Sequence, residues 1–238
     1  MNNTIMVKAI FGVVFSLAIS INSYGWGRFY ADGPRTIKAV SLTFDDGPGP
    51  TTDDILAILA QYEIKATFFM MGKNVKNRPA LAEKVAKNGH EIGNHTFSHI
   101  NFAKATGNLS EILDHEITQA LKIISQTTGQ SPPYLRMPHG YMRPWVSAVA
   151  EKHNSDIVHW TFGCDWQDMD DESMITAYLD AVHSGSILLF HDGPGRNREQ
   201  TVRILPQIIT AIRDKNYSII PLRELLAPLK TDTEINKK

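Results

Sequence analysis

The strongest restriction on the fold comes from residue 37 onward, where short apolar runs alternate with stretches of helical period. The clearest of these stretches spans 110–125, in which apolar residues recur at spacings of three and four. Strands that alternate with helices pair in parallel, because each helix returns the chain to the same end of the sheet. About seven such units predict an α/β fold, a closed or nearly closed barrel of parallel strands. The strands are expected at 39–44, 66–71, 91–94, 134–136, 156–160, 186–190 and 217–219, and the helices at 52–62, 79–87, 110–125, 144–153, 171–183 and 199–214.

The two ends of the chain depart from this pattern. Lys8 is the only charged residue before Arg28, and residues 9–21 are almost entirely apolar, close to the length of a signal-peptide core. A helix that spans a bilayer needs roughly 20 apolar residues. Cleavage of residues 1–25 as a signal peptide is therefore favoured over their retention as an N-terminal anchor. Either outcome predicts an exported protein, periplasmic, cell-envelope or secreted, that meets the membrane only through an uncleaved N-terminal segment. Residues 228–238 are polar and are expected to form a flexible tail.

Composition argues against a nucleic-acid partner and against disulfides or metal sites that need several cysteines. With 24 Lys+Arg against 25 Asp+Glu the formal net charge is −1, and no basic block occurs, so a nucleic-acid partner is not expected. Cys164 is the single cysteine, which excludes an internal disulfide and a metal site built from several thiolates. We expect Cys164 to be a small buried residue rather than a redox group.

Polar clusters follow the predicted strands, and the first two together could form a metal site. Asp45 and Asp46 follow the first strand, where two free carboxylates would repel each other unless a cation neutralised one of them. An ordinary Asp-Gly-Pro turn is the alternative. His95 and His99 follow the third strand as a His-x-x-x-His pair, which by itself could be a pair of surface histidines. Because the carboxyl ends of parallel barrel strands share one face, the two clusters together predict two imidazoles and one carboxylate around a hydrolytic metal centre.

Three further polar segments follow predicted strands: Arg-Met-Pro-His-Gly at 136–140, Asp-Trp at 165–166 and Leu-Leu-Phe-His-Asp at 188–192. The last of them repeats the first cluster, since FDDGPG at 44–49 corresponds to FHDGPG at 190–195. Each segment alone has a structural interpretation: a structural arginine, a core tryptophan or a capping histidine. Their common position at strand ends favours one shared site.

The ordered set TFDDGP, HTFSH, RMPHG, DW and LLFHD resembles the metal-dependent polysaccharide deacetylases of the NodB-homology type, carbohydrate esterase family 4. The resemblance covers residues 37–226, which we interpret as one polysaccharide deacetylase (NodB homology) domain. It implies the fold of that family, a distorted (β/α) barrel of about seven parallel strands, in agreement with the strand–helix units.

Carried over position by position, the resemblance implies a role for each motif residue. Asp46, His95 and His99 would hold a divalent metal, usually zinc, with other divalent ions used by some members. Asp45 would be the general base that takes a proton from metal-bound water, and His191 the general acid that protonates the departing amine. This division fits the chemistry, because amide hydrolysis needs an activated nucleophile and a protonated leaving group.

The remaining motif residues would support these groups and bind the acetyl group. The resemblance implies that Arg136 pairs with the base and that Asp165 orients the imidazole of the acid. Trp166 and Leu189 would line the pocket for the acetyl methyl group. The backbone N–H of His139 would help to bind the oxyanion. The family usually has Tyr or Phe at this position, so stacking against the substrate is expected to differ.

The implied activity is removal of N-acetyl groups from glycans that contain N-acetylglucosamine, such as peptidoglycan, chitooligosaccharide or an exopolysaccharide. Other functions stay open: an O-acetyl (xylan-type) esterase of the same family, a carbohydrate-binding protein without catalysis, or a periplasmic metal carrier. A serine hydrolase is disfavoured because the sequence has no Gly-x-Ser-x-Gly motif.

Overall fold

The computed structural model describes residues 27–227. The predicted signal peptide or anchor at 1–25 and the predicted tail at 228–238 lie outside the described residues. Within 27–227, no helix combines the length and the apolar character that crossing a bilayer requires.

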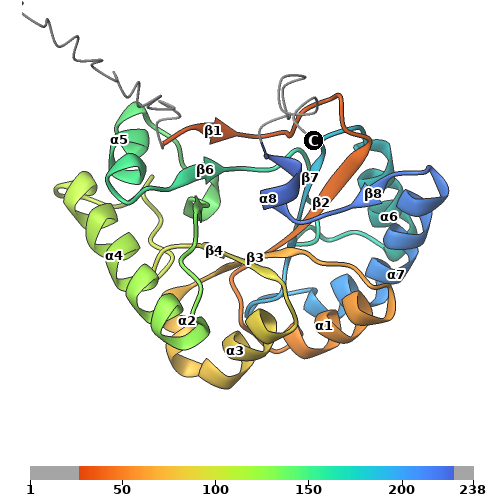
Figure 1. The fold of residues 1–238 in the computed structure, drawn as a ribbon, viewed down its shortest axis with the longest axis horizontal. Helices are drawn as coiled ribbons and strands as arrows, with labels where there is room; N and C mark the ends of the chain where they lie inside the picture. The colour runs from red at the N-terminus through yellow and green to blue at the C-terminus, as the bar shows by residue number, and fades with distance from the viewer. Residues whose placement is uncertain (1–26, 228–238) are drawn as a thin grey trace, which may run out of the picture.

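Eight strands form one sheet in which all neighbours pair in parallel. Their order is β1-β6-β5-β4-β3-β2-β7, and β8 pairs with β2 beside this path. The expected α/β barrel is confirmed as a curled half-barrel, whose strands form an arc with the helices outside it (Figure 1). The alternation does not predict β1, but it does predict the other seven strands. The strands are β1 (Phe29–Tyr30), β2 (Ala39–Asp45), β3 (Thr67–Met70), β4 (Glu91–Asn94), β5 (Tyr134–Leu135), β6 (Asp156–Val158), β7 (Ile187–His191) and β8 (Ser218–Ile219).

The segment that follows β6 lies against β7, the strand at the other end of the sheet. The backbone N–H of Thr161 donates to the oxygen of Ile187 at 2.8 Å, and that of Leu189 donates to the oxygen of Phe162 at 2.8 Å. Phe162 and Leu188 also form an isolated parallel bridge. This segment therefore contacts β7 without forming a strand of its own.

The six predicted helices are confirmed, and the short helices α2 and α8 are added to them. The α8 helix lies at the amino ends of the strands, where the backbone N–H of Leu222 donates to Thr67 Oγ1 and that of Arg223 to Glu91 Oε2, both at 3.0 Å. It therefore covers the end of the barrel opposite to the strand ends that carry the motifs. The helices are α1 (Thr52–Gln61), α2 (Gly72–Asn77), α3 (Pro79–Lys87), α4 (Leu109–Thr128), α5 (Pro144–Lys152), α6 (Asp171–Asp180), α7 (Arg198–Asp214) and α8 (Leu222–Leu225).

The side chains of β2 pack into the hydrophobic core on one face of the strand and point into the barrel on the other. All of its residues are buried. Val40, Leu42 and Phe44 belong to the hydrophobic cluster that the sheet shares with the outer helices. Thr43 and Asp45 point the other way, into the barrel, because successive side chains of a strand face opposite sides. The barrel interior is therefore polar where β2 ends.

Candidate active site

A cavity of about 390 Å³ lies at the carboxyl ends of the strands. Asp45 ends β2 and Asp46 follows it, His95 follows β4, and His191 ends β7. Strands that are distant in sequence thus bring the predicted groups together. The cavity is lined by Asp45, Asp46, His95, His99, Met137, His139, Trp160, Trp166, Leu189 and His191.

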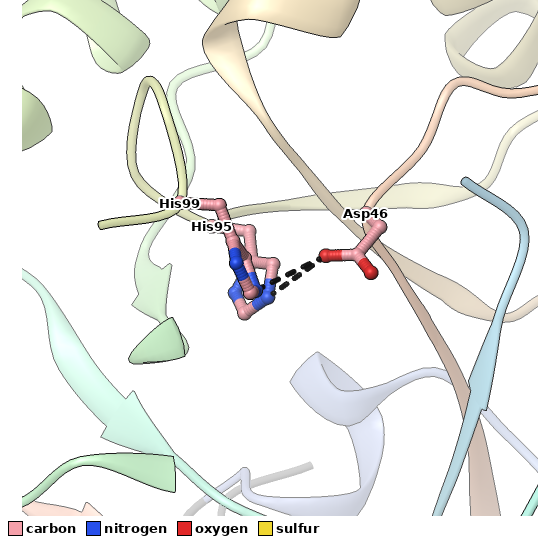
Figure 2. Close-up of side chains that lie close together, drawn as sticks. All are labelled: Asp46, His95 and His99. Atoms are coloured by element: carbon pink, nitrogen blue, oxygen red, sulfur yellow. Dashed lines mark ion pairs between the residues drawn. The ribbon is translucent and has the colours of Figure 1, made fainter. Parts of the chain in front are cut away.

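Asp46, His95 and His99 form a group that could hold a metal ion. Their candidate ligand atoms all lie within 4.8 Å of one another. Asp46 Oδ1 is 3.4 Å from His95 Nε2 and 3.3 Å from His99 Nε2, and Figure 2 shows both imidazoles beside this oxygen. Two imidazoles and one carboxylate are a ligand set used for zinc and other divalent metals, with positions left open for water or substrate.

The hydrogen bonds around these side chains fit a metal ion. His95 Nδ1 donates to the backbone oxygen of Arg136 at 2.7 Å, which directs the other ring nitrogen, Nε2, towards Asp46 Oδ1 at 3.4 Å. Asp46 Oδ1 is buried and accepts no hydrogen bond. A buried carboxylate oxygen without a partner is costly. A cation held by the three side chains would satisfy it.

Opposing effects set the protonation of these groups. Burial raises the pKa of Asp46, but its contact with His95 and the charges of His95 and His99 outweigh burial and hold the pKa below its usual range. Burial, together with the charge of His95, lowers the pKa of His99 to about 4. An ionised carboxylate and a neutral imidazole, the forms that bind metal ions, are thus favoured at Asp46 and His99. Burial lowers the pKa of His95, but the charges of Asp45 and Asp46 outweigh burial and raise it, so metal binding would displace a proton from this ring.

Asp45, the last residue of β2, is held by the buried side chain of Arg136. Arg136 Nη1 donates to Asp45 Oδ1 and to Thr43 Oγ1, both at 2.8 Å. The rest of the guanidinium donates to the backbone oxygens of Val158 and His159, at 3.0 and 2.8 Å. Because Arg136 is fully buried and all its bonds are directed, it fixes the orientation of the Asp45 carboxylate.

His191 is fixed by Asp165 at the end of β7. Its Nδ1 donates to Asp165 Oδ1 at 2.7 Å, and its backbone N–H donates to Asp165 Oδ2 at 2.8 Å. Thr201 of α7 donates its hydroxyl to the same Oδ2 at 2.9 Å. Burial lowers the pKa of His191, but the hydrogen bond and charge of Asp165 outweigh burial and raise the pKa above its ordinary value. His191 therefore holds its ring proton more tightly than a free histidine does.

The residues predicted to bind the acetyl group also line the cavity. Leu189 is buried, whereas Trp166 is 46% exposed and its ring lies edge-on to that of His191, 5.4 Å between centroids. His139 has a left-handed backbone, with φ of 55°, and its ring lies edge-on to that of His99 at 4.6 Å. The side chain at position 139 is therefore in contact with a candidate metal ligand.

Trp160 and Arg198 join the site without being predicted. The sequence pattern includes Trp160 in a strand at 156–160, but β6 ends before it, so Trp160 lies beyond the sheet and lines the cavity. Arg198 begins α7 and is buried, with its guanidinium 3.9 Å from Asp46 Oδ2 and 3.9 Å from Asp165 Oδ2. No sequence signal marks this arginine, because a charged residue in the first turn of a helix is ordinarily solvated.

Several known proteins have sequences similar to that of this chain. A family model described as polysaccharide deacetylase matches residues 32–158. A peptidoglycan-N-acetylglucosamine deacetylase of Bacillus cereus is 36% identical over 197 residues, which cover 81% of this chain and 90% of that protein. A chitooligosaccharide deacetylase of a Bradyrhizobium species is 35% identical over 210 residues, which cover 83% of this chain and 94% of that protein.

Solved structures with the same fold agree with the sequence comparison. The crystal structure of a peptidoglycan N-acetylglucosamine deacetylase matches with a TM-score of 0.79 and 30% identity, covering 86% of this chain and 95% of that one. A pseudoenzyme of carbohydrate esterase family 4 from Bacillus anthracis matches with a TM-score of 0.78 and 25% identity, covering 87% and 71%. The fold alone therefore does not secure activity. By sequence, motifs and fold together, the chain belongs to the polysaccharide deacetylases of carbohydrate esterase family 4.

Proposed function

We propose that this protein is a metal-dependent deacetylase that removes N-acetyl groups from glycans containing N-acetylglucosamine. One observation carries the proposal: a single cavity is lined by the three candidate metal ligands, by Asp45 and by His191. A protein that only binds carbohydrate needs a cleft with aromatic rings, but it does not need an acid, a base and a metal site together. Family membership supports the same class of reaction.

In this proposal Asp45 acts as the general base. Asp46, His95 and His99 would hold the ion, which when bound supplies a Lewis acid and lowers the pKa of water towards about 7. Asp45 would take the proton of the attacking water. Its Oδ1 already accepts a bond from Arg136 at 2.8 Å, so Oδ2 is the oxygen left to receive that proton.

His191 acts as the general acid at the other end of the reaction. Its Nδ1 is bound to Asp165, so Nε2 is the nitrogen that would protonate the departing amine. Trp166 and Leu189 would hold the acetyl methyl group. The backbone N–H of His139 would donate to the oxyanion, where a fixed donor stabilises the developing charge.

The relatives guide the choice of substrate. They are named for peptidoglycan and for chitooligosaccharide, and we propose these substrates here, with an exopolysaccharide as a third candidate. Peptidoglycan lies in the cell envelope, which is consistent with the predicted export of this chain. A relative named bifunctional xylanase/deacetylase is 29% identical, so an O-acetylated xylan is the alternative substrate to test.

Acetate release from peptidoglycan, chitooligosaccharides and O-acetylated xylan tests the proposal. The full chain is assayed metal-free, reloaded with Zn²⁺, and reloaded in the presence of a chelator. We expect acetate from the N-acetylated glycans only in the reloaded sample without chelator. Release that is indifferent to chelator would contradict the mechanism, and release from xylan alone would identify an O-acetyl esterase. Glycan binding without any release would indicate a binding protein.

A further inference from the structure

The loop that carries the two candidate histidine ligands has an unusual backbone. Thr96 and His99 both have a left-handed conformation, with φ of 62° and 61°. This region is unfavourable for residues with a Cβ atom and more so for a β-branched one such as threonine. A conformation of this kind persists only where the surrounding structure imposes it. Contacts outside the loop must therefore hold it.

Glu116 of α4 provides the strongest of these contacts. Its Oε2 accepts hydrogen bonds from the backbone N–H groups of Phe97 and Ser98, at 3.1 and 2.7 Å. Its Oε1 accepts a bond from the hydroxyl of Ser98 at 2.7 Å. Two successive N–H groups that converge on one oxygen form a nest, a backbone concavity that binds an anion. The Glu116 carboxylate is the anion that fills it, and it is only 6% exposed.

The rest of the loop is held by contacts with Asn94 of β4 and with the helices α4 and α2. Asn94 Oδ1 accepts a bond from the N–H of Thr96 at 2.8 Å, and Asn94 Nδ2 donates to the oxygen of Ile117 in α4 at 3.3 Å. The backbone oxygens of Thr96 and Phe97 accept bonds from the first N–H groups of α2, both at 2.9 Å. The N–H groups of Phe97 and Ser98 thus face α4, and the backbone oxygens of Thr96 and Phe97 face α2. Among residues 27–227, Glu116 is the only one whose carboxylate accepts hydrogen bonds from the backbone of this loop.

We infer that Glu116 is a positioning residue of the metal centre. By fixing the N–H groups of Phe97 and Ser98, it sets the turn that leaves His99 Nε2 3.3 Å from Asp46 Oδ1. The inference rests on the proposed function, because it assumes that His99 is a metal ligand. It adds a residue outside the sequence motifs, on a helix that supplies no ligand. Loss of a partner that orients a metal ligand typically lowers metal affinity or activity by about 10- to 100-fold.

Substitution by glutamine separates geometry from charge. The Oε1 atom of a glutamine can accept both backbone N–H bonds, and its amide group can donate to Ser98 Oγ. Glu116→Gln therefore keeps every contact with the loop while it removes the negative charge. Glu116→Ala removes both. Asp114→Ala is a matched control on the same helix, because the Asp114 carboxylate pairs with Lys152 and His153, at 2.8 and 2.7 Å, and with no loop residue of the described chain.

The experiment measures the Zn²⁺ dissociation constant of the full chain by competition with a chromophoric chelator, alongside thermal unfolding of the metal-free proteins. We expect Glu116→Ala to bind zinc about 10- to 100-fold more weakly than the unsubstituted protein. Glu116→Gln and Asp114→Ala should stay within about 3-fold of it, since both leave the loop contacts in place. Should Glu116→Ala fail to fold, Ser98→Ala removes one of the bonds and should weaken zinc binding by about 2- to 10-fold.

Two results would overturn the inference. One is unchanged zinc affinity in a folded Glu116→Ala protein, or in Ser98→Ala if the alanine variant does not fold. The other is an equal loss of affinity in Glu116→Gln and Glu116→Ala, because charge and not position would then explain the effect. If the unsubstituted protein itself binds no zinc, the proposed function fails before the role of Glu116 is reached.

Discussion

Asp45 and Asp46 are neighbours in the chain but face different partners. Asp45 belongs to β2 and points into the barrel, where Arg136 Nη1 reaches its Oδ1 at 2.8 Å. Asp46 has φ of 69°, in the left-handed region that aspartate tolerates better than most residues. Its Oδ1 lies beside His95 and His99 instead. The change of backbone conformation between the two residues separates a proposed base from a proposed ligand.

Replacement of the proposed base should stop the reaction without disturbing the metal site. In Asp45→Asn the amide can still accept the bond from Arg136, but it cannot take a proton. We expect the rate of acetate release to fall by about 10²- to 10⁴-fold, while zinc content and glycan binding remain. Both are measured on the same preparation. A normal rate would exclude Asp45 as the base, and simultaneous loss of zinc would show that it serves the metal site instead.

The role of His191 as the general acid predicts how the rate of acetate release depends on pH. His191 must be protonated to act, so activity is lost as the pH rises through its pKa, and Asp165 raises that pKa. Asp165→Asn removes the negative charge that favours the imidazolium. The alkaline limb of the rate–pH profile should therefore move to lower pH, by about one unit or more. A profile with its alkaline limb unchanged would contradict the assignment of His191 as the acid.

At the scale of elements, the packing of β3 against β4 supports the buried arginine. Phe69 of β3 lies opposite Gly93 of β4 in the parallel register. The guanidinium carbon of Arg136 lies 4.0 Å from the centre of the Phe69 ring. A Cβ atom at Gly93 would overlap Cδ1 of that ring. The absence of a side chain at position 93 thus allows Phe69 to lie under Arg136.

Gly93→Ala should therefore affect both stability and activity. The added methyl group must displace a fully buried ring, and overpacking of this kind costs about 1–3 kcal/mol. Because Phe69 packs under Arg136, we also expect slower acetate release under conditions where the variant is fully folded. Denaturant unfolding and the acetate assay measure the two effects. A variant as stable and as active as the parent would show that the ring moves freely and does not support the arginine.

At the scale of the whole molecule, the sequence predicts the fold, most of the cavity-lining residues and the supporting residues Arg136 and Asp165, but not Trp160, Arg198 or Glu116. The period of the apolar residues and the position of each motif after a strand are sufficient for the barrel. They do not reveal β1, because Phe29–Tyr30 is too short to show a period. This strand pairs in parallel with β6, and the side chain of Arg28 adds a bond to Asp156 at 2.7 Å across a long sequence separation.

The burial of Glu116 is a second feature that the sequence does not predict. On an amphipathic helix such as 110–125 a glutamate looks like a solvated residue, since acidic side chains are rarely buried. Only the packing of the loop from β4 over α4 buries it and gives it three hydrogen bonds. Arg198 is similar, because it is buried against the loop that follows β7, where its Nε donates to the backbone oxygen of Gly193 at 3.2 Å. Residues that act through tertiary contacts leave no local pattern to detect.

The claim that a divalent metal is bound by Asp46, His95 and His99 is tested most directly by anomalous diffraction at the zinc edge from crystals of the zinc-loaded protein. We predict one strong peak among the three side chains, about 2.0–2.2 Å from Asp46 Oδ1 and from Nε2 of both histidines. Loaded crystals with no peak at this position, or with zinc bound only by other residues, would contradict the claim.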